Sequence, residues 1–265
     1  MVVLRDRLML ALDRVAFAER ALAEERPKVI LQEWQKSLLR STSERILLNC
    51  SRQSGKSSLV AVLALHCALY HPASLVLCLA PALRQSQELF DKVLRFYRVL
   101  GRPVVPKTER KLSLELENGS RVVALPGTEK TIRGFSNVAL LILDEASWIE
   151  DTLYYAVRPM LAVSGGALMM LSTPYGRRGI FYEEWEEGTE WERYRIPADQ
   201  CPYIPKEFLE KERRTKPEWY YAQEYNCEFR ETEDQLWTFE MIEGARDDEL
   251  EEFTFEGDED LWKTP

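Results

Sequence analysis

The stretch ILLNCSRQSGKSSLVAVLAL, residues 46–65, decides the fold. An apolar run is followed by a short polar loop that ends in Gly55-Lys56-Ser57 and then by a second apolar run. This order predicts a buried strand, a phosphate-binding loop and a helix that opens at Ser57 or Ser58. Glycine lets the backbone approach a triphosphate closely, the lysine ammonium reaches its β- and γ-phosphates, and the serine hydroxyl can hold Mg²⁺. Cys50 stands where the general pattern has its first glycine, so this loop alone is also compatible with an ordinary helix cap beside a chance lysine.

The composition is that of a globular protein with a substantial core. The chain has 265 residues, of which 45% are hydrophobic and 11% aromatic, enough for one large domain or two modest ones. No uncharged apolar run reaches the length of about 18 residues that a membrane span needs. The N-terminal stretch carries charges every few positions, so we expect no secretory signal and a cytoplasmic setting.

The acidity of the chain is concentrated at its C-terminal end. The net charge is −9, but residues 232–265 hold thirteen acidic and two basic residues, so residues 1–231 sum to about +2. A near-neutral body can present a basic face, and the net charge therefore does not exclude a nucleic-acid partner.

Two helical patterns precede the loop. Residues 1–27 have apolar positions at helical spacing up to Pro27 and predict an amphipathic helix. In VILQEWQKSLLRS (29–41), Trp34 offers a flat ring and Gln35 an amide with both donor and acceptor, which suits an adenine base. The same pattern also fits an ordinary amphipathic helix.

After the loop, strand and helix patterns alternate. SLVLCLAP (74–81) predicts a buried parallel strand, and residues 82–101 predict a helix that ends at Gly101. The basic residues of this helix, Arg84, Lys92, Arg95 and Arg98, fit a track along a phosphate backbone, but we favour the interpretation of a solvated helix face. The stretch 111–127 alternates around Asn118-Gly119 and predicts a hairpin.

Two further apolar runs end in residues that can carry chemistry. VALLILDEASWIE (138–150) predicts a buried strand that ends in Asp144-Glu145. After a phosphate loop, the first carboxylate of such a pair contacts the Mg²⁺ shell and the second polarises the attacking water. ALMMLSTPYGRRG (167–179) predicts a strand that stops at Ser172-Thr173-Pro174, where small hydroxyls can reach a γ-phosphate. Residues 205–229 predict a helical pair broken at Pro217, and the last thirty residues have no clear period.

Together these motifs resemble the ATPase domain of viral large terminase subunits, the genome-packaging motors of tailed double-stranded DNA bacteriophages and herpesviruses. The resemblance covers about residues 28–235. Its motifs are SRQSGKS (51–57) as a variant Walker A loop, LQEWQ (31–35) as an adenine element, LLILDEA (140–146) as Walker B with its glutamate, and LSTP (171–174) as the coupling motif. TIRGFSN (131–137) and EWYYAQEYNCEF (218–229) fit the same family, whose loop lacks the first glycine and so accounts for Cys50.

The resemblance implies an α/β fold, a P-loop NTPase of the additional-strand (ASCE) type with a mostly parallel central sheet flanked by helices and a small C-terminal lid subdomain. It divides the chain into an N-terminal helix (1–27), an ATPase core (28–199), a lid (200–235) and an acidic linker or tail (236–265). Such subunits usually continue into a ribonuclease-H-like nuclease domain, and we expect this chain to be limited to the ATPase domain and to have no nuclease activity.

The resemblance also assigns roles to residues. Glu145 activates water, Lys56 and the loop hold the phosphates, Ser57 and Asp144 hold Mg²⁺, and Arg52 senses the phosphates within its own subunit. Arg133 is expected to act as an arginine finger on a neighbouring subunit, with Arg52 and Arg177 as rivals and a loop arginine in water or on DNA as the other interpretation. The ATP-binding residues are Trp34, Gln35, Ser51, Arg52, Gln53, Ser54, Gly55, Lys56, Ser57 and Ser58, and the coupling residues are Ser172, Thr173 and Pro174.

The implied activity is Mg²⁺-dependent ATP hydrolysis that translocates double-stranded DNA into a procapsid in the host cytoplasm. The implied partners are the portal protein, the small terminase subunit and further copies of the chain in a ring, a pentamer, whereas the isolated domain is expected to be a monomer without membrane contact. Two alternatives stay open. One is a helicase-like DNA-dependent ATPase, for which no second motor domain follows residue 180, and the other is a nucleotide-binding switch with little turnover.

Overall fold

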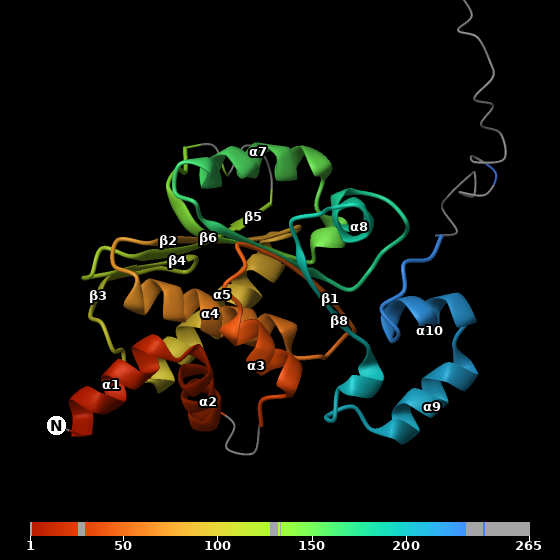
Figure 1. Cartoon of the computed structure of the whole chain (residues 1–265), viewed down its shortest axis with the longest axis horizontal. Coiled ribbons are helices and arrows are strands. Elements are labelled where there is room, and N and C mark those ends of the chain that lie inside the picture. Colours follow the sequence, from red (N-terminus) through yellow and green to blue (C-terminus); the bar gives the residue numbers. More distant parts are fainter. Residues whose placement is uncertain (1, 26–29, 128–131, 133, 232–240, 242–265) are drawn as a thin grey trace, which may run out of the picture. The chain divides into compact units, whose positions relative to one another are not determined.

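An eight-stranded, mostly parallel sheet forms the centre of the unit Met1–Arg230 (Figure 1). The computed structural model describes residues 2–25, 30–127, 132, 134–231 and 241. Glu231–Pro265 forms a second unit, of which Glu231 and Met241 are described. Apart from Met241, the predicted acidic tail over 236–265 lies outside the described residues.

The strands lie in the order β3-β4-β5-β2-β6-β7-β1-β8. The six strands from β5 to β8 in this order are parallel, and β4 and β3 add to β5 in antiparallel fashion. Their bounds are β1 Arg45–Cys50, β2 Leu75–Ala80, β3 Pro106–Glu109, β4 Ser113–Leu116, β5 Arg121–Pro126, β6 Val138–Asp144, β7 Ala167–Ser172 and β8 Glu192–Ile196.

Strand β7 lies between β1 and β6, so an additional strand separates the phosphate-loop strand from the acidic strand. In the register of these strands Asn49 of β1 is opposite Ser172 of β7, and Asp144 of β6 is opposite Leu171. The three strands therefore end at the same edge of the sheet. The residues that follow them are brought side by side there, as in other open α/β sheets.

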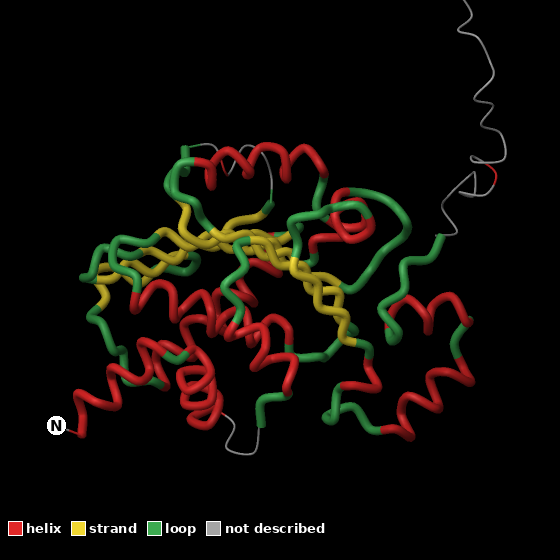
Figure 2. The backbone as a smooth tube through the Cα atoms, viewed as in Figure 1, coloured by secondary structure: helices red, strands yellow, loops and turns green. Residues whose placement is uncertain are grey.

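Helices cover both faces of the sheet, as Figure 2 shows in red on either side of the yellow strands. On one face lie α2 (Arg14–Glu25), α3 (Glu33–Arg40), α4 (Lys56–Tyr70) and α5 (Leu83–Val99), and on the other lie α7 (Asp151–Ala162) and α8 (Ile180–Glu186). Successive strand residues point to opposite faces of the sheet and pack in different cores. Leu48 packs with the first set of helices and Leu47 with the second. None of the helices within the described residues has both the length and the apolar character of a membrane span.

The N-terminal pattern that predicts a single helix forms two helices, α1 (Val2–Leu12) and α2. Asp13 lies at the break, and its carboxylate accepts hydrogen bonds from the backbone N–H groups of Val15 (2.8 Å) and Ala16 (3.2 Å). This is the geometry of an N-cap, which favours a new helix start over a continuous helix. Val15 is buried, whereas Leu12 remains 78% exposed and Leu10 is partly buried against the core, so α2 packs more deeply on the body than α1 does.

The C-terminal part of the unit contains the predicted helical pair, α9 (Lys206–Thr215) and α10 (Glu218–Glu224). Pro217 is the N-cap residue of α10, which places the break where the sequence predicts it. The short strands β3 and β8 and the helices α7 and α8 were not predicted. Two single-turn 3-10 helices, η1 (Ala146–Trp148) and η2 (Ala198–Gln200), complete the elements.

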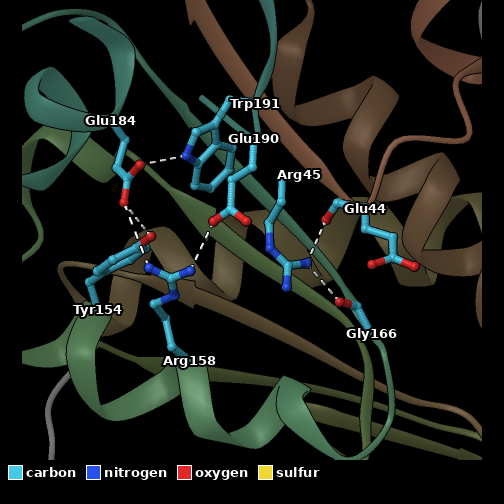
Figure 3. A network of polar contacts seen from close by, with 8 residues as sticks. All are labelled: Glu44, Arg45, Tyr154, Arg158, Gly166, Glu184, Glu190 and Trp191. Atoms are coloured by element: carbon cyan, nitrogen blue, oxygen red, sulfur yellow. Dashed lines mark hydrogen bonds and ion pairs between the residues drawn. The ribbon is translucent and has the colours of Figure 1, made fainter. Parts of the chain in front are cut away.

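A polar network holds α7, α8 and the segment before β8 together (Figure 3). The carboxylate of Glu184 on α8 accepts hydrogen bonds from Tyr154 Oη on α7 (2.7 Å) and Trp191 Nε1 (2.6 Å). Arg158 on α7 donates to Glu190 at 2.9 Å. Because the rings of Tyr154 and Trp191 are buried, these polar atoms need partners inside the protein. The network therefore fixes the helix layer behind the strand ends.

Candidate functional site

A cavity of about 660 Å³ lies at the edge where β1, β2, β6 and β7 end. Most of its walls are the residues that directly follow these strands, together with two side chains of α5 and one of α10. The lining residues are Arg52, Gln53, Ser54, Gly55, Lys56, Ser57, Ser58, Pro81, Gln85, Lys92, Glu145, Trp148, Thr173, Pro174, Tyr175 and Glu224.

The loop after β1 has the backbone that a phosphate cradle requires. Gly55 has φ +88°, a left-handed conformation that favours glycine, and α4 begins directly after it at Lys56. The helix start lies one residue before the predicted Ser57. The N-terminus of this 15-residue helix therefore directs its unpaired N–H groups and its positive dipole end toward the cavity.

One buried polar atom of the loop lacks a partner. Ser54 is 5% exposed and lines the cavity, and its hydroxyl has no hydrogen-bond partner within the described part of the chain. An unsatisfied buried hydroxyl is unfavourable unless a ligand or water bonds to it. Together with the helix N-terminus, this hydroxyl fits an anion such as phosphate.

Lys56 and Glu145 meet inside the cavity, with Lys56 Nζ 3.0 Å from Glu145 Oε1. Burial works against the ammonium charge, but the carboxylates of Glu145 and Asp144 outweigh it and raise the pKa of Lys56. Lys56 is therefore charged at neutral pH and already has an anionic partner.

The backbone of Glu145 is left-handed, with φ 54° and ψ 47°. Few residues other than glycine adopt this conformation, and non-glycine examples cluster at functional sites. It turns the chain sharply after β6, so that Glu145 lines the cavity while Asp144 stays buried behind it. Asp144 Oδ1 accepts a hydrogen bond from the backbone N–H of Glu145 at 3.0 Å, and burial raises the pKa of Asp144 to about 6.

The predicted coupling residues contact the turn that follows Glu145. The backbone N–H of Ser147 donates to Ser172 Oγ at 3.2 Å, and Ser147 Oγ donates to the carbonyl of Thr173 at 3.0 Å. Beyond them, the rings of Trp148 and Tyr175 stack with centroids 3.8 Å apart. Hydrogen bonds thus join the end of β7 to the turn that carries Glu145.

Arg52 on the loop forms an ion pair with Glu224 of α10. The carboxylate side chain is 8% exposed, whereas that of Arg52 is 67% exposed. This contact joins the C-terminal helical pair to the phosphate loop across the mouth of the cavity.

Three of the predicted nucleotide-binding residues do not line the cavity. Ser51 is fully buried, and its backbone N–H donates to the carbonyl of Ile196 at 2.9 Å. Gln35 is buried, and its Oε1 accepts a hydrogen bond from the backbone N–H of Gln32 at 2.9 Å at the start of α3. Trp34 is partly buried against the core. The adenine-binding role of Trp34 and Gln35 stays a prediction, and Arg133 lies outside the described residues.

Six lining residues were not predicted as site residues, namely Pro81, Gln85, Lys92, Trp148, Tyr175 and Glu224. Trp148 and Tyr175 lie within three residues of predicted motifs, so proximity along the chain could have indicated them. Gln85, Lys92 and Glu224 come from helices whose position over the strand ends is set by tertiary packing, which no local pattern reports.

Comparisons of the sequence with known proteins agree on one family. The family model described as terminase large subunit, T4likevirus-type, N-terminal, matches residues 47–243. The large terminase subunit of Thermus phage G20c is 31% identical over 169 residues, which are 56% of this chain and 34% of that protein. The chain thus spans about a third of the length of the curated relatives that it matches.

Solved structures show the same fold. The large terminase ATPase domain of Thermus phage P74-26 has a TM-score of 0.65 at 24% identity and covers 76% of this chain and 94% of its own. The large terminase of the thermophilic bacteriophage D6E, in complex with ADP, has a TM-score of 0.60 at 13% identity over 80% of this chain and 52% of its own. The predicted additional-strand P-loop NTPase fold is confirmed by this likeness and by the position of β7. The chain therefore belongs to the T4likevirus-type family of large terminase subunits, of which it represents the N-terminal domain.

Proposed function

We propose that this chain is the ATPase motor domain of a large terminase, and that it hydrolyses ATP to translocate double-stranded DNA into a procapsid. One observation carries the proposal, the 3.0 Å contact between Lys56 and Glu145 in a cavity lined by the loop at the start of α4. It supports the proposed roles of Lys56 as the phosphate-binding ammonium and of Glu145 as the carboxylate base, because both side chains can reach one phosphate. The ADP complex of the D6E relative, which shares the fold, is consistent with nucleotide in this cavity.

The oxygen ligands for Mg²⁺ fit the same arrangement. Ser57 lines the cavity at the start of α4, and Asp144 ends the neighbouring strand β6. Mg²⁺ favours one or two protein oxygens together with water and phosphate, so a hydroxyl and a carboxylate suffice. When bound, Mg²⁺ neutralises part of the charge on the β- and γ-phosphates. Asp144, whose pKa burial raises to about 6, is a carboxylate at neutral pH and can serve as this ligand.

The Lys56–Glu145 pair also suggests the order in which the two residues act. An entering triphosphate competes with Glu145 for the ammonium of Lys56, because the phosphate oxygens carry more charge than one carboxylate. Once Lys56 binds the phosphates, the Glu145 carboxylate is free to orient a water molecule and accept its proton. Because Ser147 bonds both Ser172 and Thr173, the end of β7 holds this carboxylate in place.

The test is a Glu145→Gln variant. We expect it to bind ATP at least as tightly as the wild type, because Lys56 loses its competing carboxylate, but to turn ATP over about 10³-fold more slowly, because the step that activates water is lost. Exposed Glu150 lies five residues further on, and Glu150→Gln is the matched control that should keep wild-type turnover. Glu145→Gln activity above about a tenth of wild type at saturating ATP would contradict the assignment. Turnover with and without double-stranded DNA then separates a motor from a nucleotide-binding switch.

The proposed partners follow from the family. They are double-stranded DNA, the portal protein, the small terminase subunit and further copies of this chain in a pentameric ring. Arg133 is proposed as the residue that one subunit presents to the γ-phosphate of its neighbour. Mixing Arg133→Ala subunits with Glu145→Gln subunits tests this role, since one intact composite site forms at their junction and should restore turnover.

A further inference from the structure

The charged side chains that line the cavity are unequally paired. Three cations, Arg52, Lys56 and Lys92, face two carboxylates, Glu145 and Glu224. Lys56 is paired with Glu145 and Arg52 with Glu224. Lys92 forms no ion pair with any residue that the structure describes. An anion that enters the cavity therefore meets Lys92 as a cation without a competing partner.

The position of Lys92 differs from that of a solvated helix lysine. It lies on α5 seven residues after Gln85, two helical turns along the same face, and both residues line the cavity. Its neighbours Leu89, Val93 and Phe96 are buried in the core and fix this side of α5 against the sheet. Arg84, by contrast, has a side chain that is 88% exposed and pairs with Glu88 on the same helix. The expectation of a solvated face thus holds for Arg84 but not for Lys92.

The local electrostatics favour an anionic partner for this lysine. Burial lowers the pKa of Lys92, while the carboxylates of Asp144 and Glu88 work in the opposite direction, and Arg95 and Lys56 add to the lowering. A half-buried ammonium has lost part of its hydration, and an anion that reaches it restores favourable interactions. Asp144 and Lys56, which both affect Lys92, lie where a phosphate loop places the metal and the terminal phosphates.

We infer that Lys92 is a second phosphate-binding lysine of this site, which contacts the terminal phosphates of a nucleoside triphosphate from helix α5. This inference rests on the proposed function, because it requires a nucleotide in the cavity. Lys92 is then the cation that attracts the triphosphate before Lys56 exchanges Glu145 for phosphate. The alternative is a lysine whose stem packs on the sheet and whose charge has no role in binding.

Affinity measurements distinguish these two roles. Calorimetry on the full chain with Mg²⁺ would give the Kd of a non-hydrolysable ATP analogue and of ADP for wild type, Lys92→Ala, Lys92→Arg and the control Arg84→Ala. We expect Lys92→Ala to weaken the ATP analogue by about tenfold or more and ADP by less than about threefold, since a charge-assisted contact to the last phosphate is lost. Lys92→Arg should restore most of the affinity, and Arg84→Ala should change neither ligand.

Each other outcome overturns a defined claim. Wild-type affinity of Lys92→Ala for the analogue, or equal weakening of the analogue and ADP, would overturn the assignment to the terminal phosphates. A second outcome is that the wild type binds the ATP analogue, Lys56→Ala does not, and Lys92→Ala binds it as the wild type does. In that case this inference fails and the proposed function stands. A wild-type chain that binds neither nucleotide overturns both. Lys92→Met keeps the aliphatic stem and replaces Lys92→Ala should the latter have a lowered Tm.

Discussion

Gln35 illustrates how a single side chain can have a structural role where a ligand contact was predicted. Its carbonyl oxygen accepts a hydrogen bond from the backbone of Gln32 and so caps α3, and its amide nitrogen lies 3.5 Å from the point where a Cβ on Gly55 would be. The amide thus fills the space between the helix start and the phosphate loop. The pattern of an amphipathic helix cannot reveal this, because it depends on how α3 packs on a loop some twenty residues later.

A substitution at this residue separates the two roles. We expect Gln35→Ala to lower the free energy of unfolding by about 1 kcal/mol in urea titrations, because a helix cap and a buried hydrogen bond are lost. Gln35→Glu keeps the acceptor oxygen and should retain most of this stability. The ratio of ATP to GTP affinity in Gln35→Glu tests the adenine prediction, since a carboxylate lacks the amide donor. An unchanged unfolding energy in Gln35→Ala would contradict the capping role.

Among single residues, those whose chemistry depends on order along the chain were predictable. Gly55, Lys56 and Ser57 follow one apolar run and Asp144 and Glu145 end another, and this combination, rather than the loop alone, predicts a phosphate loop and its acids. The unusual backbone of Glu145 was not predictable, because nothing in the residue type requires a positive φ.

At the scale of elements, an ion pair ties α10 to the phosphate loop. Glu224 is buried and pairs with Arg52, the cation that the family resemblance assigns to the phosphates. Under the proposed role of Arg52, the helix and an incoming nucleotide compete for the same guanidinium. Binding of nucleotide and attachment of the C-terminal helical pair are thereby linked.

This competition gives a prediction for Glu224→Gln. Arg52 loses its anionic partner and becomes available to phosphate, so we expect the Kd of an ATP analogue to fall by about threefold, while the Tm of the ligand-free chain decreases. Glu210→Gln on α9 is the control, because its carboxylate is exposed and pairs only with Arg214 among the described residues. Weaker nucleotide binding in Glu224→Gln would show that the ion pair presents Arg52 to the nucleotide instead of withholding it.

The elements that the sequence predicts correctly are those with a strong local signal. The buried strands β1, β2, β6 and β7 are continuous apolar runs, and the hairpin of β4 and β5 surrounds Asn118-Gly119. β8 was missed because its sequence ERYRI is mostly polar, and its parallel pairing with β1 depends on a distant segment. The single N-terminal helix was wrong because the capping capacity of Asp13 outweighs the helical spacing around it.

At the scale of the whole molecule, the N-terminal helices make stability depend on pH. His66 on α4 is 4% exposed and packs edge-on against Phe17 of α2, with ring centroids 5.1 Å apart. Burial, with Arg14 and His71 adding to it, lowers the pKa of His66 to about 4. In the unfolded chain histidine has a pKa of about 6.5, so as the pH falls the unfolded chain binds a proton at His66 before the folded chain does. The contribution of neutral His66 to the free energy of unfolding is therefore fully present above about pH 6.5 and is lost as the pH falls toward about 4.

The replacement His66→Phe should remove this dependence and keep an aromatic ring against Phe17. Between about pH 7 and about pH 5 we expect the wild type to lose up to about 2 kcal/mol more unfolding free energy than the variant. Urea titrations at several pH values measure this difference directly, because the titrating carboxylates are common to both proteins. Curves that stay parallel down to about pH 5 would assign the acid sensitivity to other groups.

Both outer strands of the sheet are unsuited to pairing with another chain. β3 is four residues long and begins with Pro106. On β8 the side chains of Arg193 and Arg195 are exposed, and their guanidinium groups bond backbone carbonyls of Trp185 (2.7 Å) and Asn226 (2.8 Å). Edge strands that are short, contain proline or carry charged side chains disfavour pairing with a strand of another chain. Copies of this chain that associate are therefore expected to do so without extending the sheet, so that each subunit can shift against the next with no shared backbone ladder to break.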